Sequence, residues 1–363
     1  MPSVLFLTGF PGFLGSTLLP RLLADRPVDR AVCLVQPRWA TLATQAVGHL
    51  ALTQPHTRGR IELIEGDIVE PGLALVPGPW RLQVSEVFHF AAAYDLAVPW
   101  PIARQVNVDG TRHLIDYCGT HFKNLQRFHH VSTCYVSGRH AGLFRESDLD
   151  LGQSFNNAYE ESKHGAEHEV RRSMDSGLPA TIYRPSTIVG DSRTGATQKY
   201  DGPYVLLRLL LRQPRVALVP VTGRPSETFF NIVPSDYVAS AIAVLSTVAE
   251  SRGQTYHLVD PSPSTIDRLV AIMGYATRRK VIRVPVPYDW GRRMLVDHPR
   301  VSRRLGMSPQ WFDYYMHRTQ YDTSAATRDL GAAQVSVPRV SQYLDKLVAF
   351  LRAHPGLPVA GLL

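Results

Sequence analysis

The stretch Thr8-Gly9-Phe10-Pro11-Gly12-Phe13-Leu14-Gly15 decides how the rest of the chain is interpreted. It follows the apolar run Val4–Thr8, which is typical of a buried strand, and it leads into Thr17–Ala24, which has helical spacing. Glycines at such a junction let the backbone turn tightly and approach a pyrophosphate, and the helix N-terminus supplies N–H donors. The motif therefore predicts a dinucleotide site, with a glycine-rich turn that binds nothing as the alternative. The candidate residues are Gly9, Phe10, Pro11, Gly12, Phe13, Leu14 and Gly15.

Short apolar runs alternate with helical periods through the first half of the chain. This alternation predicts an α/β fold, a doubly wound parallel Rossmann sheet with helices on both faces. The predicted strands are Val4–Thr8, Arg30–Val35, Ile61–Glu65, Val87–Ala91, Phe128–Ser132, Ala180–Arg184 and Tyr256–Val259. The predicted helices are Thr17–Ala24, Thr41–Leu52, Ala103–Cys118, Pro203–Arg212, Ser235–Ser246 and Val340–Ala353.

The pattern loosens after about residue 185, where Pro and Gly become frequent. We therefore expect a dinucleotide-binding domain over residues 1–185, with its sheet completed by parts of 225–260. Residues 186–363 are expected to form a smaller, mostly helical, substrate-binding lobe.

Composition excludes several classes of protein. With 44% hydrophobic and 19% charged residues in 363, disordered and coiled-coil chains are excluded. The start Met1-Pro2-Ser3-Val4 lacks the basic region of a signal peptide, and no apolar run is long enough for a membrane helix. Cys33, Cys118 and Cys134 form no C-x-x-C pair, which argues against a disulfide framework. We expect a cytoplasmic protein without integral membrane association.

The formal charge of +8 favours anionic partners, such as dinucleotides, coenzyme A or an acidic carrier protein. Nucleic acid is not expected, because the chain lacks a run of Lys and Arg and any zinc-finger or basic-helix pattern. His89, His129 and His130 lie on predicted strands without metal-ligand spacing, so no metal site is predicted.

The end of the second predicted strand bears on the choice between the two nicotinamide dinucleotides. Val35-Gln36-Pro37-Arg38 lacks the carboxylate that would bind a ribose 2′-hydroxyl, and it offers a guanidinium for a 2′-phosphate. NADP(H) is favoured on this ground, with a solvated Arg38 as the alternative. Further cofactor contacts are expected from Asp67, Ile68, Ala91, Ala92, Ala93, Pro185 and Ser186. An ordinary turn remains an alternative role for Asp67.

Tyr159 and Lys163 are four residues apart, so a helix would place them on one face. A neighbouring ammonium would lower the pKa of the phenol and let Tyr159 exchange a proton near neutral pH. The fifth predicted strand ends in Ser132 and Thr133, at the sheet edge where ligands bind. We assign Thr133 to the reacting carbonyl oxygen and Ser132 to support, although the roles could be reversed and both could simply satisfy backbone groups.

These motifs together resemble the extended short-chain dehydrogenase/reductase superfamily. The residues that carry the resemblance are Thr8–Gly15, Gly66–Ile68, His89–Ala92, Asn107–Thr111, Val131–Thr133, Tyr159, Lys163 and Tyr183–Pro185. A narrower resemblance is to the reductase domain of bacterial fatty acyl-CoA reductases, of the male-sterility and thioester-reductase type. It rests on Val87–Leu96, Phe128–Ser132, Val189–Gly195, Lys199–Tyr204, Asn231–Val238, Tyr256–Asp260 and Tyr321–Thr323.

The narrower resemblance implies an NADPH-dependent reduction of a fatty acyl thioester, on coenzyme A or a carrier protein, to an aldehyde or onward to an alcohol. Tyr159, Lys163 and Thr133 would serve equally in a ketone or hydroxysteroid dehydrogenase, or in a sugar-nucleotide epimerase. A homodimer is common in the superfamily. Tyr135 stands where smaller residues are expected and would narrow the pocket of a long-chain substrate.

Overall fold

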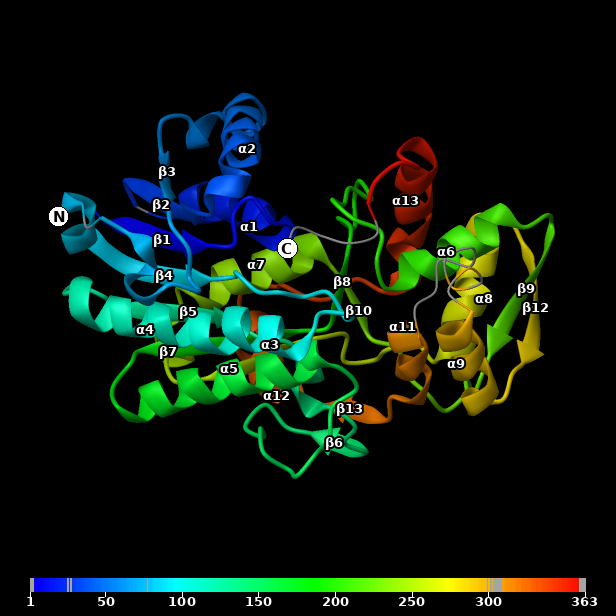
Figure 1. Cartoon of the computed structure of the whole chain (residues 1–363). Helices are drawn as coiled ribbons and strands as arrows, with labels where there is room; N and C mark the ends of the chain where they lie inside the picture. The colour runs from blue at the N-terminus through cyan, green and yellow to red at the C-terminus, as the bar shows by residue number, and fades with distance from the viewer. Residues whose placement is uncertain are drawn as a thin grey trace.

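The computed structural model describes residues 3–24, 26, 28–76, 78–298, 300, 302 and 309–358 (Figure 1). Met1 and Pro2, on which the signal-peptide prediction partly rests, lie outside these residues. Among the described residues, no helix combines the length and hydropathy that crossing a membrane requires.

A seven-stranded parallel sheet organises the larger part of the molecule. Its strands follow the order β11-β7-β5-β4-β1-β2-β3, so the direction of winding reverses between β1 and β4. In such sheets, ligands bind where the winding reverses, beyond the carboxyl ends of the strands. The strands are β1 (Val4–Thr8), β2 (Arg30–Val35), β3 (Ile61–Glu65), β4 (Val84–His89), β5 (Arg127–Val131), β7 (Ala180–Pro185) and β11 (Thr255–Leu258). The predicted doubly wound parallel fold is confirmed.

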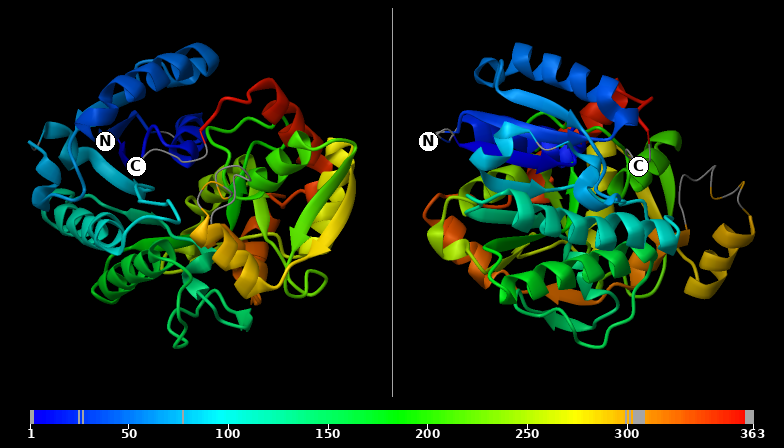
Figure 2. Two further views of the ribbon diagram at one scale, coloured as in Figure 1. Left: turned by 45° about the vertical axis from the view of Figure 1, so that its right-hand side comes forward. Right: turned by 60° about the vertical axis from the view of Figure 1, so that its left-hand side comes forward.

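Helices cover both faces of this sheet because its central strands are apolar on both sides. In β1, Leu5 and Leu7 enter the core beneath α1 (Phe13–Ala24) and α7 (Ser235–Leu245). Val4 and Phe6 enter the opposite core. That second core is closed by α4 (Gly110–His121) and α5 (Ala158–Asp175), which lie side by side in Figures 1 and 2. The first face also receives α2 (Ala40–Thr53) and α12 (Ser324–Gly331).

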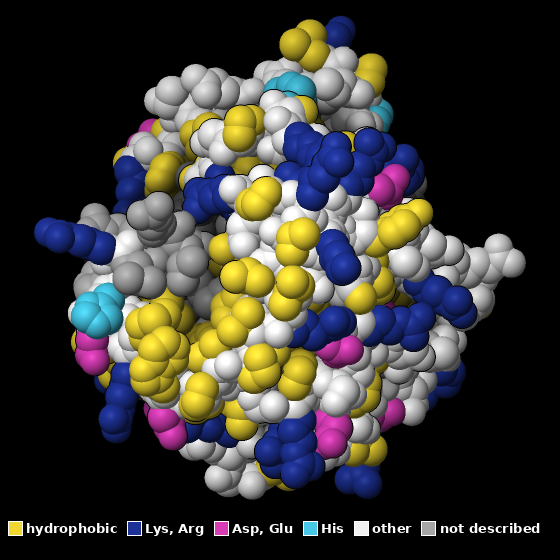
Figure 3. Space-filling view, turned by 90° about the vertical axis from the view of Figure 1, so that its right-hand side faces the viewer, with side chains coloured by type: hydrophobic (Ala, Val, Ile, Leu, Met, Phe, Trp, Pro, Cys, Tyr) yellow, Lys and Arg dark blue, Asp and Glu magenta, His cyan; other side chains and the backbone are white. Residues whose placement is uncertain are grey.

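A third core holds the smaller lobe together. It is built from the inner faces of α6 (Pro203–Arg212), α8 (Ile266–Thr277) and α13 (Val340–Ala353). The lobe also contains α9 (Tyr288–Asp297), α11 (Pro309–Asp313) and a parallel pair of strands, β9 (Val216–Val221) and β12 (Lys280–Pro285). The outward face of this pair leaves Leu218 and Ile282 exposed, and Figure 3 shows hydrophobic side chains beside Lys and Arg on this side of the molecule.

Three short parallel pairs were not predicted. They are β9 with β12, β6 (Gly142–Phe144) with β13 (Thr319–Tyr321), and β8 (Thr187–Val189) with β10 (Ile232–Pro234). Two of these pairs have strands of three residues, too short to show an alternating pattern. The predicted helix Ala103–Cys118 comprises the end of α3 (Trp100–Ala103), a π-helical turn at Arg104–Asp109 and most of α4.

Candidate active site

The glycine loop forms a close-fitting turn at the carboxyl end of β1. Gly9 has φ +85°, and a Cβ atom there would lie 2.6 Å from the backbone nitrogen of Ala91. A Cβ atom on Gly12 or Gly15 would lie within 3 Å of the Gly9 carbonyl oxygen. The first turn of α1 contains no acidic residue, so its N–H groups and dipole are free to attract an anion. The loop therefore fits the pyrophosphate of a dinucleotide. Phe10 is buried, while Phe13 and Leu14 are half-buried.

A polar chain connects the ends of β2 and β3 beside this loop. The Gln36 amide nitrogen donates to Asp67 Oδ2 at 2.8 Å, and Arg38 Nε donates to the Gln36 amide oxygen, also at 2.8 Å. Asp67 Oδ1 accepts from the backbone N–H of Val69, as in a turn, and Ile68 is buried. Arg38 itself is exposed. The predicted cofactor residues Arg38 and Asp67 are thus joined through Gln36, which had no assigned role.

A buried imidazole fixes the ends of β1 and β4 at the point where the winding reverses. Thr111 donates to the carbonyl of Asn107, so its oxygen accepts from His89 Nε2 at 2.9 Å. The other ring nitrogen, Nδ1, then accepts from the Thr8 hydroxyl at 2.8 Å, and that hydroxyl accepts from the N–H of Ala91. Burial lowers the pKa of His89 to about 3, so the ring is neutral and keeps this tautomer.

Asn107, in the π-helical turn, ties the predicted Ala91–Ala93 segment to α5. Its amide oxygen accepts from the N–H of Ala93 at 2.8 Å, and its amide nitrogen donates to the Ala93 carbonyl and to Ser162 Oγ. The sequence held a signal for this role, because Asn107 belongs to one of the stretches that carry the superfamily resemblance. Its side chain had nevertheless been given no function.

The helix that carries Tyr159 begins where its sequence dictates. Asn157 caps α5 by accepting a hydrogen bond from the backbone N–H of Glu160 at 3.0 Å. Tyr159 therefore lies in the first turn, half-buried, and its phenol interacts with the Thr133 side chain at the end of β5. Thr133 lies 3.5 Å from the carbonyl of Pro185, so the ends of β5 and β7 meet at Tyr159.

The acidified phenol expected from the sequence is not found in this arrangement. Lys163 Nζ donates to the carbonyl of Val131 at 2.6 Å, and burial lowers the pKa of this lysine to about 8. Burial likewise raises the pKa of Tyr159 above its usual value, against the smaller lowering effect of the Thr133 hydrogen bond. The reason for the correction is that desolvation disfavours the phenolate, while the ammonium is held by a strand-end carbonyl. Tyr159 is a neutral phenol at neutral pH.

The two strand-end hydroxyls point to different partners. Ser132 Oγ donates to Glu167 Oε2 at 2.8 Å, inside the protein, and the same carboxylate accepts from Arg184. Only one of the two, Thr133, reaches Tyr159. Glu167 and Arg184 were missed as part of this arrangement, because their contact depends on the packing of α5 against β7.

Two other predicted residues lie at the same edge of the sheet. Ser186 is buried, and its hydroxyl has no hydrogen-bond partner among the described residues. Such an unpaired hydroxyl is available to a ligand group, and the contact to a carboxamide stays a prediction. Cys134 is fully buried and burial raises the pKa of its thiol to about 12, so it packs as a small apolar residue.

A cavity of about 390 Å³ opens beside this edge. Tyr135 lines it, as the sequence led us to expect, and its ring meets that of Tyr314 edge-on, with centroids 5.0 Å apart. Tyr314 donates to Glu160 Oε1 at 2.7 Å, which connects the cavity wall to the residue after Tyr159. The cavity is lined by Tyr135, Leu143, Phe229, Phe230, Asn231, Asp260, Pro261, Ser262, Pro263, Tyr314, His317, Thr319, Gln320 and Tyr321.

Comparison with known proteins connects this site to reductases. The nonribosomal peptide synthetase FrzA of Cladobotryum is 28% identical over 95% of this chain and 36% of its own length. The aldehyde reductase lnaA of Aspergillus flavus is 29% identical over 71% of this chain and 26% of its own length. The chain thus spans about a third or less of these two relatives. The crystal structure of the terminal R domain from the myxalamid PKS-NRPS pathway superposes with a TM-score of 0.83 at 27% identity, covering 98% of this chain and 93% of that one.

The family model described as "Male sterility protein", an NAD-binding family, matches residues 7–242, which is more than half of the chain. Its matched region includes the glycine loop, Thr133, Tyr159, Lys163 and Ser186. The chain therefore belongs to the male sterility protein family, and it is an oxidoreductase of the extended short-chain dehydrogenase/reductase type that uses a nicotinamide dinucleotide.

Proposed function

We propose that this chain is an NADPH-dependent reductase that converts an acyl thioester, bound to coenzyme A or to a carrier protein, into an aldehyde. The observation that supports the proposal is the placement of the Thr133 and Tyr159 side chains next to each other at the ligand-binding edge of the sheet. Two hydroxyls that meet there can both donate to one carbonyl oxygen. Relatedness to a nonribosomal peptide synthetase, and similarity to the terminal R domain of the myxalamid PKS-NRPS pathway, support the thioester as the substrate.

The dinucleotide, when bound, supplies a hydride to the carbonyl carbon of the substrate. Thr133 and Tyr159 stabilise the negative charge that develops on the carbonyl oxygen. Because burial keeps Tyr159 protonated, the phenol is suited to donate a proton to that oxygen. The resulting hemithioacetal then loses the thiol and leaves the aldehyde. Lys163 keeps one N–H on the Val131 carbonyl and has two further N–H groups to hold the cofactor ribose.

Several observations favour NADPH and a compact acyl group. Arg38 is exposed at the end of β2, and its guanidinium offers charge-assisted hydrogen bonds to a 2′-phosphate. The cavity is lined by the aromatic side chains of Tyr135, Tyr314 and Tyr321 together with polar residues, which suits an acyl group with polar or aromatic parts.

A long alkyl chain has less support. The apolar side of α6 is mostly core, and Pro203 and Leu206 from this helix border a small pocket of about 20 Å³.

The thiol product distinguishes this function from others on the same scaffold. The full chain is mixed with NADPH and a panel of acyl-CoA thioesters, and we measure NADPH absorbance together with free thiol. One thiol per NADPH indicates reduction to the aldehyde, and one thiol per two NADPH indicates reduction to the alcohol. Oxidation of NADPH by aldehydes or ketones, without thiol release from any thioester, would replace the proposal by the ketone or aldehyde reductase that the relative lnaA suggests.

A further inference from the structure

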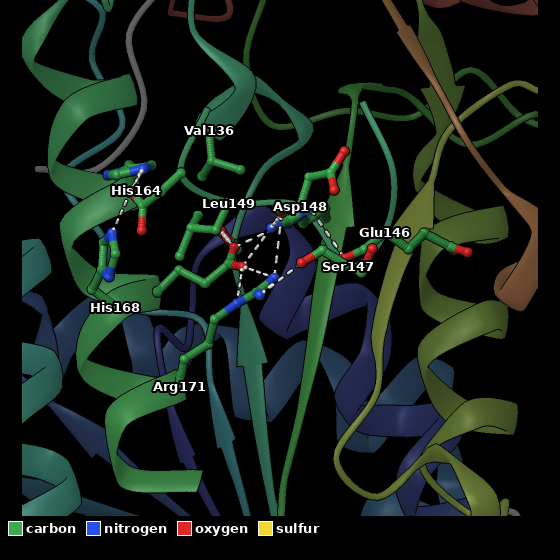
Figure 4. A network of polar contacts seen from close by, with 12 residues as sticks. Val136, Glu146, Ser147, Asp148, Leu149, His164, His168 and Arg171 are labelled. Atoms are coloured by element: carbon green, nitrogen blue, oxygen red, sulfur yellow. Dashed lines mark hydrogen bonds and ion pairs between the residues drawn. The ribbon is translucent and has the colours of Figure 1, made fainter. Parts of the chain in front are cut away.

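A cluster of His and Asp side chains, of the kinds that can ligate a metal, lies on α5 and the loop before it, away from the proposed active site. His168 Nε2 is 2.9 Å from Asp150 Oδ1, and His164 Nε2 is 3.2 Å from the same oxygen. The three donor atoms all lie within 4.8 Å of one another. The two histidines are four residues apart and occupy successive turns of the helix, as Figure 4 shows.

The cluster faces solvent, so an ion could reach it. The side chains of Asp150 and His168 are 63% and 45% exposed, whereas that of His164 is 15% exposed. Lys163, on the same helix, is almost fully buried and points to the carbonyl of Val131. The helix therefore presents its proposed catalytic residue on one side and this cluster on another.

The ring of His164 is oriented as a metal ligand requires. Its Nε2 is buried and has no hydrogen-bond partner among the described residues, although it lies 3.2 Å from Asp150 Oδ1. A buried polar atom without a partner is costly, so this nitrogen is available as a donor atom to an ion beside Asp150. The ring also interacts with the backbone of Leu149, and metal-binding histidines usually have such a second contact.

We propose that Asp150, His164 and His168 bind one divalent first-row transition-metal ion of the Zn²⁺ type. Imidazole nitrogen and carboxylate oxygen are ordinary ligands for such ions, and water would complete a tetrahedral site. Donor atoms around one tetrahedral zinc are roughly 3.3 Å apart, so small side-chain rotations would suffice. The sequence prediction of no metal site rests on His89, His129 and His130 and does not include His164 and His168.

The bound ion would fasten one loop to the helix that carries Tyr159. Asp150 follows Arg145–Leu149, a segment whose carbonyls accept hydrogen bonds from Arg171 (Figure 4). Arg184 donates to carbonyls of the same segment. An ion shared by Asp150, His164 and His168 would add a link between that segment and α5. Because the ion binds the folded protein, it would raise the unfolding temperature in proportion to its affinity and concentration.

Zinc binding to the full chain, free of any affinity tag, tests the proposal without cofactor or substrate. The protein is stripped with a chelator, dialysed and titrated with ZnCl₂ by calorimetry, and its unfolding temperature is measured with and without zinc. We expect one site in the wild type and a higher unfolding temperature with zinc. Asp150→Asn and His168→Ala should each weaken binding on the order of 10- to 100-fold and abolish the rise. His49→Ala, which removes an exposed helical histidine elsewhere, should change neither result.

Three outcomes would overturn the proposal. They are no zinc binding by the wild type, unchanged binding by both Asp150→Asn and His168→Ala, and an equal loss in His49→Ala. Absence of zinc binding by the wild type would mean that only hydrogen bonds and a proton hold Asp150, His164 and His168 together. Asp150 and His168 are exposed, so the metal-free unfolding temperatures of their variants should match that of the wild type, which shows that these variants remain folded. The test is independent of the proposed reductase activity, because neither readout involves turnover.

Discussion

Arg184 and Glu167 form an ion pair in the interior, with Arg184 Nη2 2.6 Å from Glu167 Oε1 and neither side chain accessible to solvent. The pair joins β7 to α5, and Ser132 at the end of β5 donates to the same carboxylate. Burial opposes the ionisation of Glu167, but the charges and hydrogen bonds of Arg184 and Arg171 outweigh this effect and lower its pKa to about 2. The Glu167–Arg184 ion pair and the Ser132 hydrogen bond thus connect β5, β7 and α5 to one another. Two of these elements, β5 and α5, position the proposed catalytic residues.

Replacement of Glu167 by Gln should destabilise the protein by about 3–5 kcal/mol, because Arg184 is left buried without a counter-charge. The measurement is urea-induced unfolding at neutral pH. Glu169→Gln, on the same helix, removes a carboxylate whose partner Arg172 is exposed, and it should cost at most about 1 kcal/mol. Equal losses in the two variants would contradict the special role of the buried pair.

Tyr159→Phe should lower kcat by roughly 10²- to 10⁴-fold, because the variant keeps the ring and removes the proton donor. Binding of NADPH, followed by fluorescence titration, should stay close to that of the wild type. Tyr275→Phe, which alters an exposed tyrosine of α8, serves as the matched control. Turnover by Tyr159→Phe at the wild-type rate would remove this residue from the mechanism.

Arg38→Ala should raise KM for NADPH by about 10-fold or more and leave KM for NADH nearly unchanged, because only NADPH carries the 2′-phosphate. Steady-state kinetics with each cofactor provide the measurement. Arg58→Ala removes another exposed arginine of the same half of the chain and should alter neither constant. A cofactor preference that survives in Arg38→Ala would mean that Arg38 is simply solvated.

The ionisation of Glu86 in the folded state determines part of the pH dependence of the free energy of unfolding. Burial opposes its ionisation, but hydrogen bonds from His129 and Arg26 and the charge of Arg26 outweigh burial and lower its pKa from about 4.5 to about 2. The ionised carboxylate therefore stabilises the folded state above its unfolded-state pKa, and this contribution is lost as the pH falls from about 4.5 towards 2. We expect a loss of up to about 3 kcal/mol over this interval.

Urea unfolding of the wild type and Glu86→Gln at several pH values measures this contribution. The variant should be less stable near neutral pH and should lose less stability than the wild type between about 4.5 and 2. Glu62→Gln is the control, since Glu62 pairs with Arg30 at the surface. Parallel stability curves for wild type and Glu86→Gln would contradict the assignment.

Much of the central sheet could be predicted from sequence because local pattern determined it. Val4–Thr8, Arg30–Val35 and Ile61–Glu65 are strands with the predicted bounds, since short apolar runs bounded by turns report burial directly. The strand expected at Val87–Ala91 is β4, but it begins at Val84 and ends at His89. The last two predicted residues, Phe90 and Ala91, lie beyond the end of β4. They come just before Ala93, whose backbone is hydrogen-bonded to Asn107.

The orientation of side chains at the site depended on distant residues and could not be predicted. Ser132 and Thr133 are adjacent in the sequence and both carry a hydroxyl. Their roles differ because Glu167 accepts the hydrogen bond of Ser132 inside the protein. Lys163 has the expected spacing from Tyr159, yet its ammonium is drawn to the carbonyl of Val131. The spacing of residues in the sequence indicates which side chains belong to the site, whereas tertiary packing determines which of their atoms are in contact.

The edge strand β11 comes from Thr255–Leu258, after α6 and β9 of the smaller lobe, and α7 and α12 complete the core on one face of the sheet. Cutting the gene after residue 185 would therefore leave a half with an unprotected strand edge and a bare apolar surface. Recombination between related genes could therefore exchange the nucleotide-binding sheet and the smaller lobe only together. The substrate specificity of such proteins would have to change through the loops between strands and helices, and not through exchange of a separate substrate-binding domain.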